Sequence, residues 1–203
     1  MKKLLVVLCI FVASFALSGM ARAFELDFDD LSNNLTSVPD GYGGYHWSQF
    51  KNLDATDSKY KNSGYLASVV SLKNVIYNDK AQDASVSADT PFIFNGAYYT
   101  AAWKNGLHVS VTGYRSNSVV GSDEFVVSAY APTWHSPSWS GAVDMLTFHS
   151  YGGEGVTGYG GFGNHFAMDN FSVASAVPLP PSLFLLAPGL LGISIIRRRR
   201  LSR

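Results

Sequence analysis

Cysteine is almost absent from this sequence. The single residue, Cys9, lies within the first apolar run of the chain, which follows Lys2 and Lys3. Together with the small-residue pattern at positions 21–23, this is typical of a secretory signal peptide that is cleaved after residue 23. The run is too short for a good membrane span, so we prefer a signal peptide to an anchor. A mature protein beginning at Phe24 has no cysteine, which excludes disulfides, thiol nucleophiles and cysteine metal sites.

Basic residues are scarce in the body of the chain, residues 24–176. Seven lysines and arginines stand there against 15 aspartates and glutamates, so the body has a formal charge of −8 although the whole chain is balanced. An acidic exported domain repels polyanions, and we therefore expect no nucleic-acid partner. The body is long enough for one domain with a hydrophobic core.

Long apolar stretches with helical spacing are also missing from the body. Short runs rich in β-branched and aromatic residues recur instead, separated by Gly, Asn, Asp and Ser. This pattern predicts an all-β fold, an antiparallel jelly-roll-like β-sandwich. The expected strands are residues 24–31, 64–71, 91–103 (in two parts, with a bend at Asn95-Gly96), 107–114, 123–131, 143–151 and 164–174. Residues 151–163 are expected to form a glycine-rich loop.

Motifs that mark catalysis are not found. The five histidines show no zinc-binding spacing, and neither a nucleophile elbow nor a phosphate-binding glycine loop is present. We therefore expect no enzyme activity. A polysaccharide hydrolase stays open as an alternative, because two suitably spaced carboxylates are all that glycoside hydrolysis requires. The candidates for such a pair are Asp123, Glu124, Asp144 and Glu154.

Acidic and amide side chains gather on the first and the last expected strand. Asp27, Asp29 and Asp30 lie on the first, and Asp169 and Asn170 lie on the last. These two strands are commonly neighbours in a jelly roll, so oxygen ligands of the kind that Ca²⁺ prefers would meet there. The residues predict a structural calcium site, with Glu25 as an additional ligand. The alternative is that they cap turns and tie loops by hydrogen bonds.

Aromatic residues in two loop regions are candidates for ligand binding. Tyr42 and Tyr45 precede one strand-like run, and Trp134 and Trp139 lie in a segment bracketed by prolines. Sugars stack their C–H faces on exposed rings, so these residues predict a carbohydrate contact. The alternative is packing beneath the loops. Trp47 and Trp103 lie on strand-like runs, and we expect them in the core, as we do most tryptophans.

The C-terminal region, residues 177–203, has three parts in a fixed order. Val177-Pro178-Leu179-Pro180 comes first, a strongly apolar stretch at residues 183–196 follows, and Arg197, Arg198, Arg199 and Arg200 come last. The apolar stretch predicts a short transmembrane helix, and the arginines predict that its end stays in the cytoplasm. By itself, this pattern is that of a membrane anchor.

The same order resembles the PEP-CTERM sorting signal, in its VPLPA variant. Leu179 replaces the glutamate of the type motif, and Pro181 stands where the variant has alanine. The resemblance implies recognition by an exosortase-type processing enzyme in a Gram-negative bacterium that makes extracellular polysaccharide. It implies a membrane-anchored intermediate and then a place on the cell surface or in the extracellular matrix.

The body resembles a family of exported domains found in surface and PEP-CTERM proteins. The similar stretches are residues 28–31, 38–50, 63–65, 92–114 and 166–173. The resemblance implies a jelly-roll sandwich related in architecture to carbohydrate-binding modules, and it brings no established activity. We therefore predict an exported, non-enzymatic structural or carbohydrate-binding module of the polysaccharide matrix. The alternatives are a surface polysaccharide hydrolase and a plain membrane-anchored envelope protein.

Overall fold

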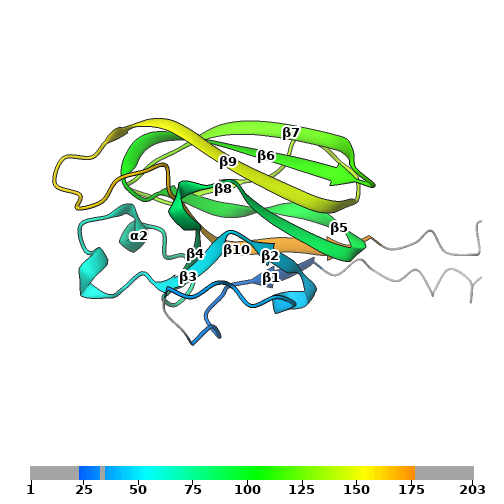
Figure 1. Cartoon of the computed structure of the whole chain (residues 1–203), viewed down its shortest axis with the longest axis horizontal. Helices are drawn as coiled ribbons and strands as arrows, with labels where there is room; N and C mark the ends of the chain where they lie inside the picture. The colour runs from blue at the N-terminus through cyan, green and yellow to red at the C-terminus, as the bar shows by residue number, and fades with distance from the viewer. Residues whose placement is uncertain (1–22, 33–34, 177–203) are drawn as a thin grey trace, which may run out of the picture. The chain divides into compact units, whose positions relative to one another are not determined.

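The computed structural model describes residues 23–32 and 35–176, and within them the fold is all-β and antiparallel (Figure 1). The strands are β1 (Ala23–Leu26), β2 (His46–Ser48), β3 (Phe50–Asp54), β4 (Asn74–Asn78), β5 (Ala84–Ala101), β6 (Lys104–Arg115), β7 (Ser118–Val127), β8 (Thr133–His135), β9 (Val143–Gly155) and β10 (Phe166–Ser175). The short helices are η1 (Tyr42–Gly44), η2 (Ser58–Tyr60), α2 (Gly64–Ala67) and η3 (Asp79–Ala81). The predicted fold class is confirmed at this level.

The long strand β5 belongs to two layers. Residues 84–87 pair with β9 and β2, whereas residues 92–101 pair with β10 and, near their end, with β8. A register shift between Ser87 and Phe92 separates the two parts, and Pro91 lies there without an N–H to donate. One layer therefore runs β7-β6-β9-β5-β2. The other runs β3-β4-β10-β5-β8, with β1 added along β10 (Figure 1).

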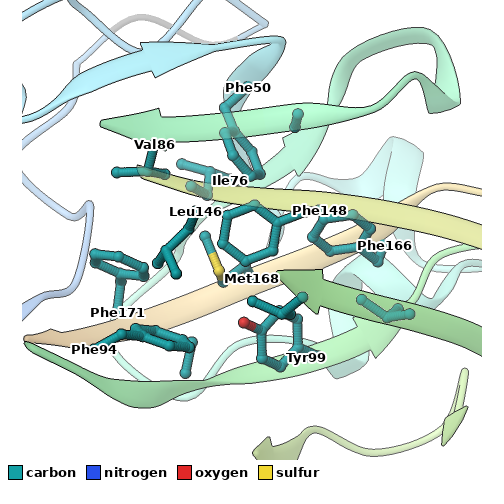
Figure 2. Close-up of a cluster of buried hydrophobic side chains, with 14 of the residues drawn as sticks. Phe50, Ile76, Val86, Phe94, Tyr99, Leu146, Phe148, Phe166, Met168 and Phe171 are labelled. Atoms are coloured by element: carbon teal, nitrogen blue, oxygen red, sulfur yellow. The ribbon is translucent and has the colours of Figure 1, made fainter. Parts of the chain in front are cut away.

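Alternation along the strands places the core between these layers. In β6, Leu107, Val109 and Val111 are buried, while the polar residues between them are only partly buried, as the sequence predicts. The Phe148 ring from β9 packs against rings from the opposite layer (Figure 2). The distance between ring centres is 6.2 Å to Phe166 and 5.5 Å to Phe50. The two layers therefore bury their apolar faces against each other.

A second apolar cluster lies where the segment between β3 and β4 covers part of the β4-β10 layer. Tyr65 packs there against Tyr77 at 5.5 Å. The prediction of a strand over residues 64–71 is wrong. The Ser63 side chain accepts the Tyr65 N–H at 3.2 Å and begins α2, and a Cβ at position 64 would overlap the Ala101 carbonyl. Glycine thus allows the helix to lie directly on β5.

Three other sequence expectations differ from the structure. The first strand ends at Leu26, because Phe28 takes a positive φ of 62° and turns its ring into the core. The expected bend at Asn95-Gly96 does not divide the segment into two strands, because β5 continues through both residues, although Gly96 takes a φ of 140° and the register with β10 shifts there. The expected loop at 151–163 is shorter, because β9 extends to Gly155 along β6.

The predicted signal peptide and sorting signal fall on residues 1–23 and 177–203, almost entirely outside the described residues. Among residues 23–32 and 35–176, no helix has the length and apolar character needed to cross a membrane.

Candidate carbohydrate-contact surface

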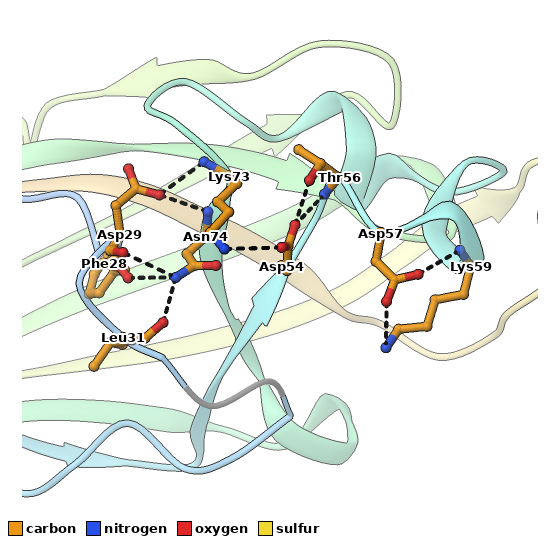
Figure 3. A network of polar contacts seen from close by, with 9 residues as sticks. All are labelled: Phe28, Asp29, Leu31, Asp54, Thr56, Asp57, Lys59, Lys73 and Asn74. Carbon is orange, nitrogen blue, oxygen red and sulfur yellow. Dashed lines mark hydrogen bonds and ion pairs between the residues drawn. The ribbon is translucent and has the colours of Figure 1, made fainter.

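Two of the side chains predicted to bind calcium, those of Asp29 and Asp169, lie against the same loop. β1 pairs with β10, as expected, and the loop before β4 lies against both acidic groups. The Asp29 carboxylate accepts backbone N–H bonds from Leu72, Lys73 and Asn74, each at 2.9 Å (Figure 3 shows the bonds from Lys73 and Asn74). Partial burial raises the pKa of Asp29, but these bonds outweigh it and hold the pKa below its ordinary value. Asp29 therefore ties its own segment to the β4 loop as a carboxylate.

Asp169 holds the preceding part of the same loop. Its carboxylate accepts the N–H groups of Val70 and Ser71 at 2.8 and 3.0 Å and the Ser71 hydroxyl at 3.1 Å. Burial is the largest influence on Asp169 and raises its pKa in spite of these bonds. Together, Asp29 and Asp169 accept five consecutive backbone N–H groups from residues 70–74. We refer to this arrangement as the carboxylate clamp.

The remaining members of the predicted calcium set have other partners. Asp30 accepts the Tyr42 hydroxyl at 2.6 Å, Asn170 donates to Glu25 at 2.8 Å, and Asp27 accepts the Asp29 N–H at 3.2 Å. No group of three or more His, Cys, Asp or Glu side chains in the described part of the chain is placed to hold a metal ion. The geometry matches the alternative of loop-tying hydrogen bonds, and structural calcium stays a prediction.

Trp134 is the predicted sugar-contact residue with the most suitable geometry. It lies on β8 opposite Tyr98 of β5, and 39% of its surface is exposed. Its ring rests on Gly96, where a Cβ would approach the indole to 2.7 Å, and the Tyr98 ring meets it edge-on at 5.1 Å. The indole N–H donates to the Ser136 hydroxyl at 2.7 Å. These contacts fix the orientation of a tryptophan that remains accessible to a ligand.

A polar group lies in the same row as Trp134. Asp169 pairs with Tyr98 on the other side of β5, so Trp134, Tyr98 and Asp169 are successive neighbours across three strands. Cross-strand neighbours project from the same face of a sheet. The row therefore joins two aromatic rings to the Ser71 side of the carboxylate clamp, where Asp169 itself is buried and bonded to the loop. We call Trp134 and Tyr98, with their support Gly96 and Ser136, the Trp134 surface.

Trp139 does not share the exposure of Trp134. Its side chain packs over Gly113 and Gly121, which face each other on β6 and β7, and it is half-buried against the core. A Cβ at position 121 would lie 2.6 Å from the Trp139 Cβ. Its ring fills the space that the two glycines leave, so Trp139 offers less ring surface than Trp134, and its role in sugar contact stays a prediction.

The tyrosine candidates also serve the core. Tyr45 is buried, with its ring 5.0 Å from Phe92, so its assignment to a ligand site is wrong. Tyr42 is half-buried and stacks on Phe28 at 5.8 Å. Burial and the bond to Asp30 raise the pKa of the Tyr42 hydroxyl. Trp47 packs against the same cluster, as expected, and donates its N–H to the Tyr42 carbonyl at 2.9 Å.

Sequence reasoning missed the contacts that hold the β8 segment in place. The His135 ring stacks on Phe125 of β7, with 3.7 Å between the ring centres. Asp123 accepts hydrogen bonds from the backbone N–H of Ser138 at 2.6 Å and from the Ser138 hydroxyl. Its Oδ2 atom lies 3.3 Å from Nε2 of His135. The sequence gives no indication of these pairs, which lie 10 to 15 positions apart.

Asp123 and Glu124, two of the carboxylates considered for hydrolysis, do not form an acid–base pair. Asp123 and Glu124 are adjacent on β7 and therefore project to opposite faces. Hydrogen bonds from Ser138 outweigh burial and lower the pKa of Asp123, and bonds with Tyr151 and His108 lower that of Glu124. A glycosidase needs one carboxyl group with a raised pKa to act as the acid. Neither residue has this property.

Comparisons with known proteins bear on the fold. No known family and no curated protein matches the sequence. Among solved structures, a DUF4465 family protein from Bacteroides caccae ATCC 43185 is similar, with a TM-score of 0.51 and 13% identity, over 79% of this chain and 95% of that one. A DUF4465 family protein from Bacteroides ovatus ATCC 8483 has a TM-score of 0.48 and 10% identity, over 77% and 100%. TmCBM61 in complex with beta-1,4-galactotriose has a TM-score of 0.37 and 11% identity, over 71% and 99%. The chain thus has an all-β fold similar to that of a DUF4465 family protein.

Proposed function

We propose that this protein is an exported, non-enzymatic module of the cell surface or extracellular matrix that binds polysaccharide through the Trp134 surface. The observation that carries the proposal is an exposed indole whose orientation is fixed from below by Gly96 and at its N–H by Ser136. The two-layered strand pairing supports a jelly-roll-like sandwich as the scaffold.

The physical basis is stacking on a ring that is already in place. A sugar offers an apolar C–H face to the indole, and hydroxyl groups beside it meet polar side chains. Because Trp134 is held before the ligand arrives, little side-chain entropy is lost on binding. One exposed platform of this kind suits a linear polysaccharide, which contacts a surface along its length.

The proposal includes the route to the surface. Residues 1–23 would direct export, and an exosortase-type enzyme would recognise Val177-Pro178-Leu179-Pro180 and remove the apolar stretch with its arginines. Mass spectrometry of protein purified from the producing cell tests this step. A C-terminus that lacks Arg197–Arg200 is expected. A mature protein that retains them would instead be a membrane-anchored envelope protein.

Co-sedimentation with the extracellular polysaccharide of the producing strain tests the binding. We expect the protein to pellet with the polysaccharide and Trp134→Ala to remain in solution. Phe24→Ala is the matched control, since Phe24 on β1 is 46% exposed and should be dispensable. Equal pelleting of the wild type and Trp134→Ala would refute the site. Shortening of the polysaccharide during the incubation would refute the non-enzymatic part and favour the hydrolase.

A further inference from the structure

A shallow hollow of about 490 Å³ lies apart from the Trp134 surface. It opens where residues 58–62, at η2, and the loop after β9 approach Trp103, and both segments lie at the same end of the body (Figure 1). The volume is within the range of small-molecule sites. None of the residues that line it belongs to the Trp134 surface, so it is a second candidate site.

The charge of the hollow is opposite to that of the body. Lys59 and Lys61 line it, and no carboxylate of the described ranges does, although the body carries a formal charge of −8. Lys59 Nζ pairs with Asp57 at 3.2 Å and lies 4.9 Å from the centre of the Tyr60 ring (Figure 3 shows the Asp57 contact). The Lys61 ammonium has no hydrogen-bond or ion-pair partner among the described residues. Its charge is therefore available to an anion.

Trp103 supplies a fixed aromatic wall. A Cβ at Gly161 would overlap its ring, so the indole lies directly against that glycine. Tyr65 meets the Trp103 ring edge-on, at 5.3 Å and an angle of 88°. A ring held in this way stacks against a sugar without losing rotamer freedom.

Two glycines leave the loop side of the hollow open. A Cβ added at Gly158 or at Gly160 would meet no atom within 4 Å. Gly158 has a φ of 90°, which favours glycine, whereas Gly160 has no positive φ. A larger side chain at position 160 is therefore compatible with the backbone and would project into open space.

We propose that this hollow binds a carboxylated sugar, namely a uronic acid unit of an acidic polysaccharide. The carboxylate would face Lys61, and the sugar ring would lie against Trp103. The charge of the body opposes long, densely charged polyanions, so the site favours short stretches of uronic acid. This ligand class goes beyond the binding assigned to the Trp134 surface and does not depend on it.

Calorimetric titration of the full protein with tetragalacturonate, and with neutral galactotetraose as the matched sugar, tests the proposal. We expect tighter binding of the acid by about two- to fivefold, the range of one exposed ion pair, and a loss of this preference as salt is raised. Lys61→Gln should remove the preference. Arg115→Gln, which removes a charge at the opposite end of β6, should keep it. Gly160→Leu should block both ligands.

Equal affinity for the two sugars would overturn the proposal, as would equal effects of Lys61→Gln and Arg115→Gln. Trp134→Ala separates this site from the proposed function. We expect it to abolish pelleting with the matrix polysaccharide and to leave tetragalacturonate binding unchanged. If Trp134→Ala abolishes tetragalacturonate binding, the acid binds at the Trp134 surface and the hollow is not its site.

Discussion

Replacement of Asp29 by asparagine tests the carboxylate clamp directly. Lys73 and Asn74 donate to Oδ1 of Asp29, and Leu72 donates to Oδ2. An asparagine that keeps its oxygen at the Oδ1 position would turn its NH₂ group toward the Leu72 N–H, so that two donors face each other. A hydrogen bond to a charged acceptor contributes about 1.5–3 kcal/mol. Because water reaches this loop, we expect Asp29→Asn to lower the free energy of unfolding by about 1.5–2 kcal/mol.

Urea denaturation measures this loss. With a slope of about 2 kcal/mol per molar urea, the midpoint should fall by roughly 0.8–1 M. Asp27→Asn removes the same charge two positions away, where the exposed carboxylate accepts, among the residues that the structure describes, only the Asp29 N–H at 3.2 Å. We expect that control to shift the midpoint by less than about a quarter of this amount, as is usual for exposed side chains.

The effect of Asp29→Asn should also depend on pH. The pKa of Asp29 is lower in the folded protein than its ordinary value of about 3.9. A lowered folded pKa stabilises the fold above the ordinary pKa, and this contribution is lost as the pH falls through the folded pKa. The difference between wild type and Asp29→Asn should therefore be full at neutral pH and shrink below about pH 4.

Two results would refute the clamp. One is equal destabilisation by Asp27→Asn and Asp29→Asn. The other is a wild-type melting temperature that falls when chelator is added. Both together would indicate that the two carboxylates share a calcium ion, as the sequence pattern predicts.

Two further substitutions test the packing. Tyr99→Phe should raise the free energy of unfolding by about 1 kcal/mol in the same urea assay. The reason is that the Tyr99 hydroxyl is fully buried and has no hydrogen-bond partner in the described part of the chain. A loss of stability would show that the hydroxyl has a partner such as buried water. Gly121→Ala should lower the free energy of unfolding by about 1–3 kcal/mol, and the melting temperature with it, because the new Cβ would lie 2.6 Å from the Trp139 side chain. Gly160→Ala, where the space is open, is its control, and equal melting temperatures for the two variants would contradict the packing described here.

The strands that form the sides of the core could be predicted because alternation is a local property. In β6, buried Leu107, Val109 and Val111 alternate with polar residues, and this pattern needs only the sequence around each position. The segment at 64–71 has the same β-branched and apolar composition but is not a strand. Its conformation depends on Ser63 as a cap and on the Ala101 carbonyl, which lies far away in the sequence.

The candidate sites depend even more on distant residues. The sequence predicts that the calcium candidates lie close together, because the first and last strands of a jelly roll are neighbours. The sequence does not show that the loop at 70–74 supplies N–H groups to the same carboxylates. Similarly, Lys61 and Trp103 are 42 positions apart, and only the fold places them on one hollow.

Trp134 and Trp139 show why local sequence cannot separate an exposed ring from a half-buried one. Both lie in one segment, and their difference comes from β6 and β7, where Gly113 and Gly121 make room for Trp139. The turn between these strands has positive φ at Ser116 and Asn117, as a tight two-residue hairpin requires. A regular register from that turn would place Gly113 opposite Val120. The register shifts by one residue between Gly113 and Tyr114, and only this irregularity brings the two glycines opposite each other. The site of Trp139 therefore depends on a β-bulge, which neither the alternation of residues nor the turn sequence reveals.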